Sequence, residues 1–305
     1  MNIVVFGAGS LGSLLGGLLA REHDVTLVGR DQHVSVITDS GLAITGAFDD
    51  RTTPDATTDG TGLAGDVALV TVKAFDTATA AEALATGSFD AVCSLQNGMG
   101  NEAVLREHVD APVLAGTVTY GAIRREPGVV ECTGEGDVVV GAASGGESPH
   151  ADRLAYAFRA VDVDAAATTD MPRRLWSKLA VNAGINAVTA LARVENGALL
   201  DGDANDLAVA AARETARVAR SHDVSLSNRD AVAHLEAVAD DTATNESSMR
   251  QDVEAGQRTE VDAINGYVVD AAREARRKLD LDVPVNETLT TLLRAWEAGH
   301  GVREN

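Results

Sequence analysis

The chain has 305 residues, which is longer than most proteins built around one hydrophobic core, so we expect two domains. It carries 46 acidic against 25 basic residues, a net charge of −21, with the acids spread along the whole chain. This charge argues against a nucleic-acid partner, because such binding depends on basic patches that neutralise phosphates. An acidic surface poor in lysine is also typical of proteins adapted to high salt, which screens the repulsion.

The remaining composition excludes several other classes. Cys93 and Cys132 match no metal or redox spacing, so we expect buried, reduced thiols and no metal site. There is no recognisable signal peptide, and no segment approaches the roughly 18 uninterrupted apolar residues of a membrane span. We therefore expect a cytoplasmic protein without a membrane partner. Aromatic residues make up only 3% of the chain, which predicts a core of Ala, Val, Leu and Ile.

The first half of the chain alternates between two patterns. Short apolar runs predict strands, helical periodicity predicts helices between several of them, and the expected strands lie at 2–6, 23–30, 41–45, 67–72, 91–95 and 113–123. The expected helices lie at 10–20, 77–85 and 101–109. Strands that alternate with helices form mostly parallel sheets, so the pattern predicts an α/β, doubly wound sheet of the Rossmann type.

The pattern changes in the second half. Residues 128–143 form two apolar runs around a Gly-rich turn, which predicts a hairpin added to the sheet. Beyond residue 170 the pattern is helical almost to the end, with expected helices at 172–192, 203–222, 228–241 and 247–279. We therefore expect a dinucleotide-binding domain over residues 1–170 and an all-helical C-terminal domain, for substrate and catalysis, over residues 171–305.

The first chemical motif is GAGSLG, in which Gly7, Gly9 and Gly12 form the G-x-G-x-x-G pattern. The motif follows an expected strand and opens an expected helix, which is the context of a dinucleotide-binding turn. The first glycine permits the tight turn, the second lets the backbone approach a pyrophosphate, and the third lets helix and strand pack closely. The turn with Ser10 and Leu11 is therefore predicted to bind a dinucleotide at the helix N-terminus.

The end of the second strand selects between the two nicotinamide cofactors. An acidic residue there, roughly 20 residues past the glycines, is typical of NAD binding. This chain has Arg30, which can pair with a 2′-phosphate, so NADPH is favoured, while Asp31 keeps NADH open. Lys73, at the end of the strand over 67–72, would add a second cation at the same sheet edge; the simpler interpretation is a solvated lysine.

Asn97 follows the strand over 91–95, and Asn97-Gly98 is first of all a turn signal. Because ligands of such sheets lie beyond the carboxyl ends of the strands, Asn97 is also placed to contact cofactor and substrate.

The segment WSKLAVNAGIN carries a polar stripe through an apolar helix. Lys178, Asn182 and Asn186 are spaced by four and therefore share one helix face. That face could simply be exposed, but exposed faces of this chain are expected to be rich in Asp and Glu. Amides and an ammonium instead suit a small substrate with hydroxyl and carbonyl groups.

Further along, Ser248, Asp252, Gly256 and Glu260 also advance by fours, which predicts one face of a continuous helix. Glu260 is either solvated or oriented toward the lysine, keeping it protonated.

These motifs together resemble the ketopantoate reductase (2-dehydropantoate 2-reductase) family. The similarity runs from GAGSLG through VKAFDT, QNGMG and WSKLAVNAGINAVTAL to SSMRQDVEAGQRTEVDAINGYV, nearly the whole chain in order. The resemblance implies a Rossmann domain followed by a helical domain, and NADPH-dependent reduction of the 2-keto group of 2-dehydropantoate in pantothenate synthesis. It implies Lys178 and Glu260 as catalytic residues and Arg30 and Lys73 as contacts to the cofactor phosphate. The residues that it implies for substrate binding are Asn97, Asn182, Asn186, Asn196 and Ser248.

Two other functions stay open at this point. A reductase of another small 2-keto or 3-hydroxy acid would share fold and cofactor, whereas a non-catalytic nucleotide sensor would need neither Lys178 nor Glu260. A homodimer is also left open.

Overall fold

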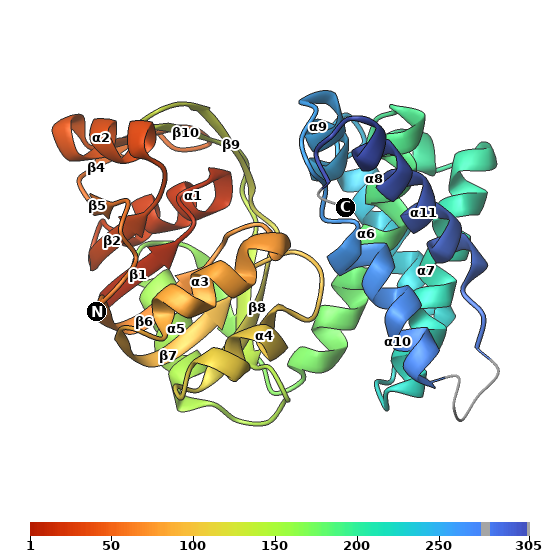
Figure 1. Ribbon diagram of the computed structural model, residues 1–305, viewed down its shortest axis with the longest axis horizontal. Coiled ribbons are helices and arrows are strands. Elements are labelled where there is room, and N and C mark those ends of the chain that lie inside the picture. The colour runs from red at the N-terminus through yellow and green to blue at the C-terminus, as the bar shows by residue number, and fades with distance from the viewer. Residues whose placement is uncertain (276–280, 304–305) are drawn as a thin grey trace. The chain divides into compact units, whose positions relative to one another are not determined.

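The computed structural model describes residues 1–275 and 281–303. Two compact units are present: a sheet unit, formed by residues 1–96 and 101–171, and a helical unit, formed by residues 97–100 and the chain from residue 172 onward. All strands of the described chain belong to the sheet unit (Figure 1). The predicted fold class, a Rossmann-type sheet followed by an all-helical part, is confirmed.

The sheet unit is built on an eight-stranded sheet of order β12-β11-β8-β7-β6-β1-β2-β5. The strands are β1 (Asn2–Phe6), β2 (Asp24–Val28), β5 (Asp55–Thr57), β6 (Ala64–Val70), β7 (Ser88–Ser94), β8 (Val113–Val118), β11 (Asp137–Ala142) and β12 (Asp164–Ala167). Neighbouring strands are parallel except β8 and β11. The chain moves outward from β1 to β2 and β5 and returns to β6 on the other side of β1. Ligands of doubly wound sheets bind at such a reversal, beyond the carboxyl ends of the strands.

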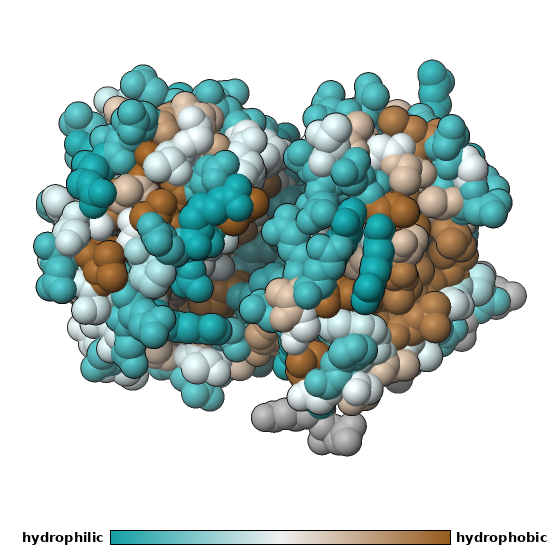
Figure 2. Space-filling view, turned by 90° about the horizontal axis from the view of Figure 1, so that it is seen from above, coloured by the Kyte–Doolittle hydropathy of each residue, from teal (hydrophilic) through white to brown (hydrophobic). Residues whose placement is uncertain are grey.

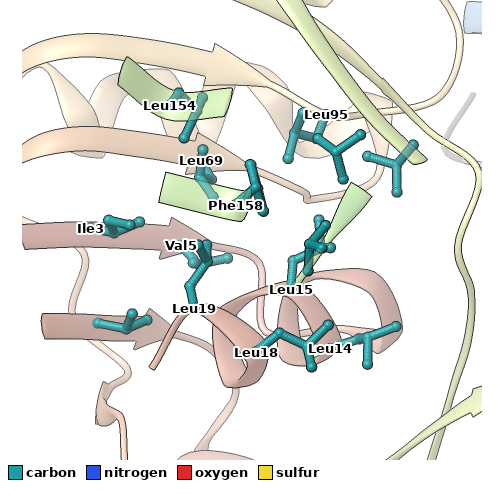
Figure 3. Packing of buried hydrophobic residues seen from close by; sticks show 14 of the residues in the cluster. Ile3, Val5, Leu14, Leu15, Leu18, Leu19, Leu69, Leu95, Leu154 and Phe158 are labelled. Atoms are coloured by element: carbon teal, nitrogen blue, oxygen red, sulfur yellow. The ribbon is translucent and has the colours of Figure 1, made fainter. Parts of the chain in front are cut away.

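Both faces of this sheet are buried. Ile3 and Val5 of β1 contribute to a core with α1 (Ser10–Leu19) and α5 (Pro149–Arg159), whereas Val4 and Phe6 pack with α3 (Thr77–Leu84) and α4 (Asn101–His108). Figure 3 shows side chains of α1 and α5 converging on the first of these faces. Because successive strand residues point to opposite faces, burial on both sides explains the uninterrupted apolar run of β1.

Helix α1 is enclosed on its other side by a second, four-stranded sheet. This sheet has the order β4-β3-β10-β9 and consists of β3 (Leu42–Gly46), β4 (Asp50–Thr52), β9 (Gly121–Glu126) and β10 (Val129–Gly134). A side chain at Gly16 would lie 2.4 Å from Leu27, and one at Gly17 would lie 2.9 Å from Ile44, so neither position has room for one. A helix that is apolar all round is a buried helix, which is the case here. Helix α2 (Asp31–Ser40) follows β2 and was not predicted.

The expected hairpin over 128–143 is wrong. Its two strands, β10 and β11, belong to different sheets: β10 pairs with β3 and β9, and β11 pairs with β8 and β12. The expected strand over 113–123 is likewise two strands, β8 and β9, one in each sheet. The Gly-rich segment is a crossing between sheets, where a Cβ at Gly136 would approach the carbonyl carbon of Thr119 to 2.5 Å. Apolar runs around glycines do not identify a strand's partner.

The helical unit contains α6 (Met171–Ala192), η2 (Asn196–Leu199), α7 (Gly202–Ser221), α8 (Asn228–Asp241), α9 (Ser248–Glu254), the π-helical segment η3 (Asp262–Gly266), α10 (Tyr267–Ala275) and α11 (Pro284–Gly299). The predicted helices over 172–192, 203–222 and 228–241 are confirmed. The helix expected over 247–279 is wrong, because Gly256 adopts φ +63° just after α9 and the chain resumes as η3 and α10. The last part of that expected helix, residues 276–280, lies outside the described residues.

Candidate cofactor and active site

The glycine motif forms the turn between β1 and α1. Gly7 has φ +111°, and the backbone N–H groups of Gly7 and Ala8 both donate to the carbonyl of Val28 on β2. A Cβ at Gly12 would lie 2.2 Å from the carbonyl oxygen of Gly7 and 2.4 Å from Oγ1 of Thr71. The first and third glycines are therefore required by the fold itself, through backbone conformation and close packing.

Gly9 is different. Its φ of −81° is open to any residue, and among the described residues a Cβ there would meet only the carbonyl oxygen of Gly7, at 3.9 Å. No atom of the described chain thus explains the glycine, whereas a ligand that approaches the backbone closely would. This open space, at the N-terminus of α1 and the carboxyl edge of the sheet, fits the pyrophosphate of a dinucleotide.

The predicted cofactor-selecting residues lie at the same edge. Arg30 is exposed at the N-cap of α2, and Asp31 is the exposed first residue of that helix, where an acid stabilises the helix dipole. Lys73, partly buried, precedes the short helix η1 (Ala74–Asp76) after β6.

A buried polar network beneath this edge was not predicted. Nε2 of Gln96 donates to the carbonyl of Val72 at 3.0 Å and to Oγ1 of Thr77 at 2.7 Å, and Oγ1 of Thr77 donates to Oδ1 of Asn101 at 2.9 Å. Thr77, Gln96 and Asn101 are all buried. The network fixes the segments that follow β6 and β7. Its sequence signal was the polar Gln96 just after the apolar strand β7, whereas Thr77 and Asn101 are the first residues of α3 and α4.

In the helical unit, α6 carries the predicted stripe. Lys178 and Asn182 are partly buried and Asn186 is 6% exposed, so this face is not a solvated one. The polar groups lie among buried apolar residues of the same helix, such as Leu179 and Ala183. Amides and an ammonium that are partly buried can donate and accept hydrogen bonds, so this face is chemically suited to a small polar ligand.

Two contacts connect further predicted residues to α6. The loop that contains Asn97 is bound to η3, because the N–H of Met99 donates to the carbonyl of Ala263 at 2.9 Å. Nδ2 of Asn265, also on η3, donates to the carbonyl of Ala183, next to Asn182. The structure thus brings the Asn97 loop, η3 and the middle of α6 together within the helical unit.

Glu260 lies just before η3 and is 6% exposed. Its neighbour Thr259 donates from N–H, at 2.8 Å, and from Oγ1, at 2.6 Å, to the fully buried carboxylate of Glu297. Nη1 of Arg303 donates to the other oxygen of Glu297 at 2.7 Å. At the start of η3, burial opposes ionisation of Asp262, but hydrogen bonds from Arg294 and Arg303 outweigh it and lower its pKa. The segment that carries Glu260 is therefore fixed by groups that sequence reasoning missed.

The other two predicted substrate residues lie near the end of α6. Asn196 in η2 is 6% exposed; its Nδ2 donates to Oγ1 of Thr242, and its Oδ1 has no partner among the described residues. Ser248 is the exposed first residue of α9, and the N-cap of α9 is Ser247. Ser247 is joined to α6 through Oγ1 of Thr189, at 2.7 Å.

Other predicted properties can be compared with the described residues. Cys93 and Cys132 are buried and unpaired, and burial raises the pKa of both thiols. Within residues 1–275 and 281–303, no three His, Cys, Asp or Glu side chains cluster in a way that could hold a metal ion. No helix in that part of the chain is long and apolar enough to cross a membrane. Figure 2 shows hydrophilic residues spread widely over one face, with apolar areas between them.

A Rossmann-type sheet with an open glycine turn, followed by a helical unit with a buried polar stripe, defines a class of nicotinamide-dependent oxidoreductases. Residues 3–145 match the family described as ketopantoate reductase PanE/ApbA, and residues 170–297 match its C-terminal domain. This chain therefore belongs to the ketopantoate reductase family.

Individual relatives agree with that assignment. A 2-dehydropantoate 2-reductase of Halobacterium salinarum is 44% identical over 304 residues, covering 96% of this chain and 98% of that protein. The crystal structure of a PanE/ApbA family ketopantoate reductase from Ralstonia eutropha is 31% identical, with a TM-score of 0.89 over 99% of this chain and 100% of that one. A D-mandelate dehydrogenase solved with NADH and anilino(oxo)acetate has a TM-score of 0.91 over 99% of this chain and 100% of that one; at 23% identity it shows the fold alone.

Proposed function

We propose that this protein catalyses the NADPH-dependent reduction of 2-dehydropantoate to pantoate, a step of pantothenate synthesis. The observation that carries the proposal is the partly buried Lys178–Asn182–Asn186 face in a chain of this family. The sheet unit is the cofactor domain, and the helical unit supplies the substrate-binding and catalytic residues.

NADPH, when bound, supplies a hydride to the C2 keto carbon. Negative charge then develops on the keto oxygen, and the ammonium of Lys178 stabilises it and donates the proton that completes the hydroxyl. Glu260 orients this ammonium and keeps it protonated. Lysine is a weak acid in water, so partial burial favours release of the proton.

The remaining polar residues bind the substrate. Amides of Asn97, Asn182 and Asn186 can both donate and accept, as a hydroxyl requires. Oδ1 of Asn196, which has no partner among the described residues, accepts a hydrogen bond from a further hydroxyl of the substrate. Ser248 and the backbone N–H groups at the start of α9 meet the carboxylate.

Arg30 and Lys73 contact the cofactor phosphate, which favours NADPH over NADH despite Asp31. The experiment follows loss of reduced-nicotinamide absorbance with 2-dehydropantoate, using NADPH or NADH, at low and at molar salt. We expect rapid oxidation with NADPH preferred, and higher activity at molar salt, where the acidic surface is screened. Preference for NADH would contradict the role of Arg30.

A second candidate is a reductase of another small 2-keto or 3-hydroxy acid, which would share the fold and the cofactor. A panel of these acids at matched concentration distinguishes the two functions. The proposed function requires the highest kcat/KM for 2-dehydropantoate, whereas a higher value for another acid supports the second candidate. If no keto acid at any salt oxidised NADPH although NADPH bound, the chain would be a nucleotide sensor instead.

A further inference from the structure

Strand β9 borders the glycine turn. It is the edge strand of the four-stranded sheet, so part of its backbone is free of strand partners. The N–H of Arg124 donates to Oγ of Ser10, the first residue of α1, at 3.0 Å. This bond holds Arg124 beside the turn that the sequence assigns to cofactor binding.

The strand register sets the direction of the Arg124 side chain. Arg124 lies opposite Val130, and Ala122 lies opposite Cys132. Val130 and Cys132 are buried in the core that contains α1, with Ala122 packed against it. Side chains of opposed residues share one face of a sheet, so Arg124 extends from the face toward α1 while its end is exposed. Its neighbour Arg125 instead forms an ion pair with Glu131.

A second arginine, Arg30, lies at the same edge of the sheet unit, at the N-cap of α2. The charge of Arg124 acts on His33, whose pKa is lowered to about 4, first by burial and then by this cation. His33 lies on α2, one turn from Arg30. Within the described residues, neither the Arg30 nor the Arg124 guanidinium forms an ion pair or a hydrogen bond, although acids outnumber bases by 46 to 25.

We propose that Arg124 is a second binding residue for the 2′-phosphate of NADPH and acts together with Arg30. Two guanidinium groups match the roughly two negative charges of a phosphate monoester and can each bind it through two hydrogen bonds. They also offset the repulsion that the Asp31 carboxylate exerts on the phosphate. The proposal rests on the proposed function only in that a dinucleotide binds this turn.

The test measures binding of NADPH and of NADH to the full chain, without substrate, by the fluorescence of the reduced nicotinamide at one fixed molar salt. Arg124→Ala is expected to raise the Kd for NADPH about tenfold and leave the Kd for NADH unchanged. Arg124→Lys should give an intermediate value, because an ammonium keeps the charge and loses the paired hydrogen bonds. The matched control is Arg125→Ala, the next residue on the same strand, which should bind both cofactors as the wild type does.

Each outcome decides the matter. An equal loss of affinity for NADPH and NADH would mean that Arg124 binds the pyrophosphate, which both cofactors share, and would overturn the proposal. An unchanged Kd, or the same loss of affinity in Arg125→Ala, would also overturn it. If Arg124→Ala lowers Tm, the Kd values of Arg124→Lys are used instead, because this variant keeps the backbone hydrogen bond to Ser10. Because no substrate is present, selectivity for NADPH can be confirmed here even if 2-dehydropantoate is not reduced.

Discussion

The glycine turn of the sheet unit and the polar face of α6 are two candidate sites with opposite relations to the fold. The backbone conformation at Gly7 and the close packing at Gly12 both require glycine, so the fold and the proposed cofactor binding favour the same residues there. Lys178 and Asn182 instead place polar groups in a helix whose other residues are largely buried and apolar, and the packing of that helix does not itself call for polar side chains. The sequence of the turn therefore reports on both fold and function, whereas the polar face reports mainly on function.

The largest effect should come from the polar face. Lys178→Ala removes the proposed proton donor, so kcat should fall about 10²–10⁴-fold, the usual contribution of general acid catalysis. The Kd for NADPH should stay near the wild-type value, because the cofactor turn is in the other unit. Steady-state kinetics and cofactor titration check this.

Arg173→Ala, an exposed position on the same helix whose ion pair with Asp230 is 3.7 Å long, is the matched control and should change none of them. Unchanged turnover in Lys178→Ala would remove the acid role and weaken the contrast between the two sites.

The same contrast explains how far the sequence could predict the molecule. Helix α6 was predicted almost to its ends because an uninterrupted 3.6-residue pattern is local information. The β1–turn–α1 unit was predictable for a related reason, since the strand, the glycine spacing and the helix follow one another within a short stretch of chain.

Non-local features were not predictable in this way. Which sheet β10 and β11 join depends on β3 and β8, far along the chain. The spacing of Ser248 and Glu260 suggested one helix face, but Gly256 adopts a left-handed conformation that ends the helix. Glu297 binds Thr259, the neighbour of Glu260, although the two residues are 38 positions apart in the sequence. Nothing in the local pattern indicates that contact.

A second prediction tests the sheet unit through His33. Its Nε2 contacts Oγ of Ser13 at 2.9 Å, and its Nδ1 accepts from the N–H of Gly128, so it joins α1, α2 and the β9–β10 turn. Its pKa is lowered from 6.5 to about 4, by burial and then by Arg124. The folded state thus binds fewer protons than the unfolded state between these values. The stability contributed by neutral His33 is present above pH 6.5 and is lost as the pH falls toward 4, by on the order of 3 kcal/mol.

Urea unfolding between pH 4.5 and 7 at constant salt measures this loss. His33→Gln should flatten the dependence on pH, whereas His150→Gln, in the same unit, should leave it as in the wild type. A wild-type free energy of unfolding that is constant across this window would contradict the prediction, because His33 would then take up its proton equally well in the folded and the unfolded state.

The smallest effect separates fold from binding inside the glycine turn itself. Gly12→Ala places a methyl group 2.2 Å from the carbonyl oxygen of Gly7, which should destabilise the sheet unit by about 1–3 kcal/mol. Gly9→Ala places one where the nearest protein atom is 3.9 Å away, so Tm should hardly change. If the pyrophosphate passes over Gly9, that methyl group obstructs it, and the Kd for NADPH and NADH should rise together. Thermal unfolding paired with cofactor titration distinguishes the two variants. A Gly9→Ala protein that binds both cofactors like the wild type would mean that the open space at Gly9 is not the path of the pyrophosphate.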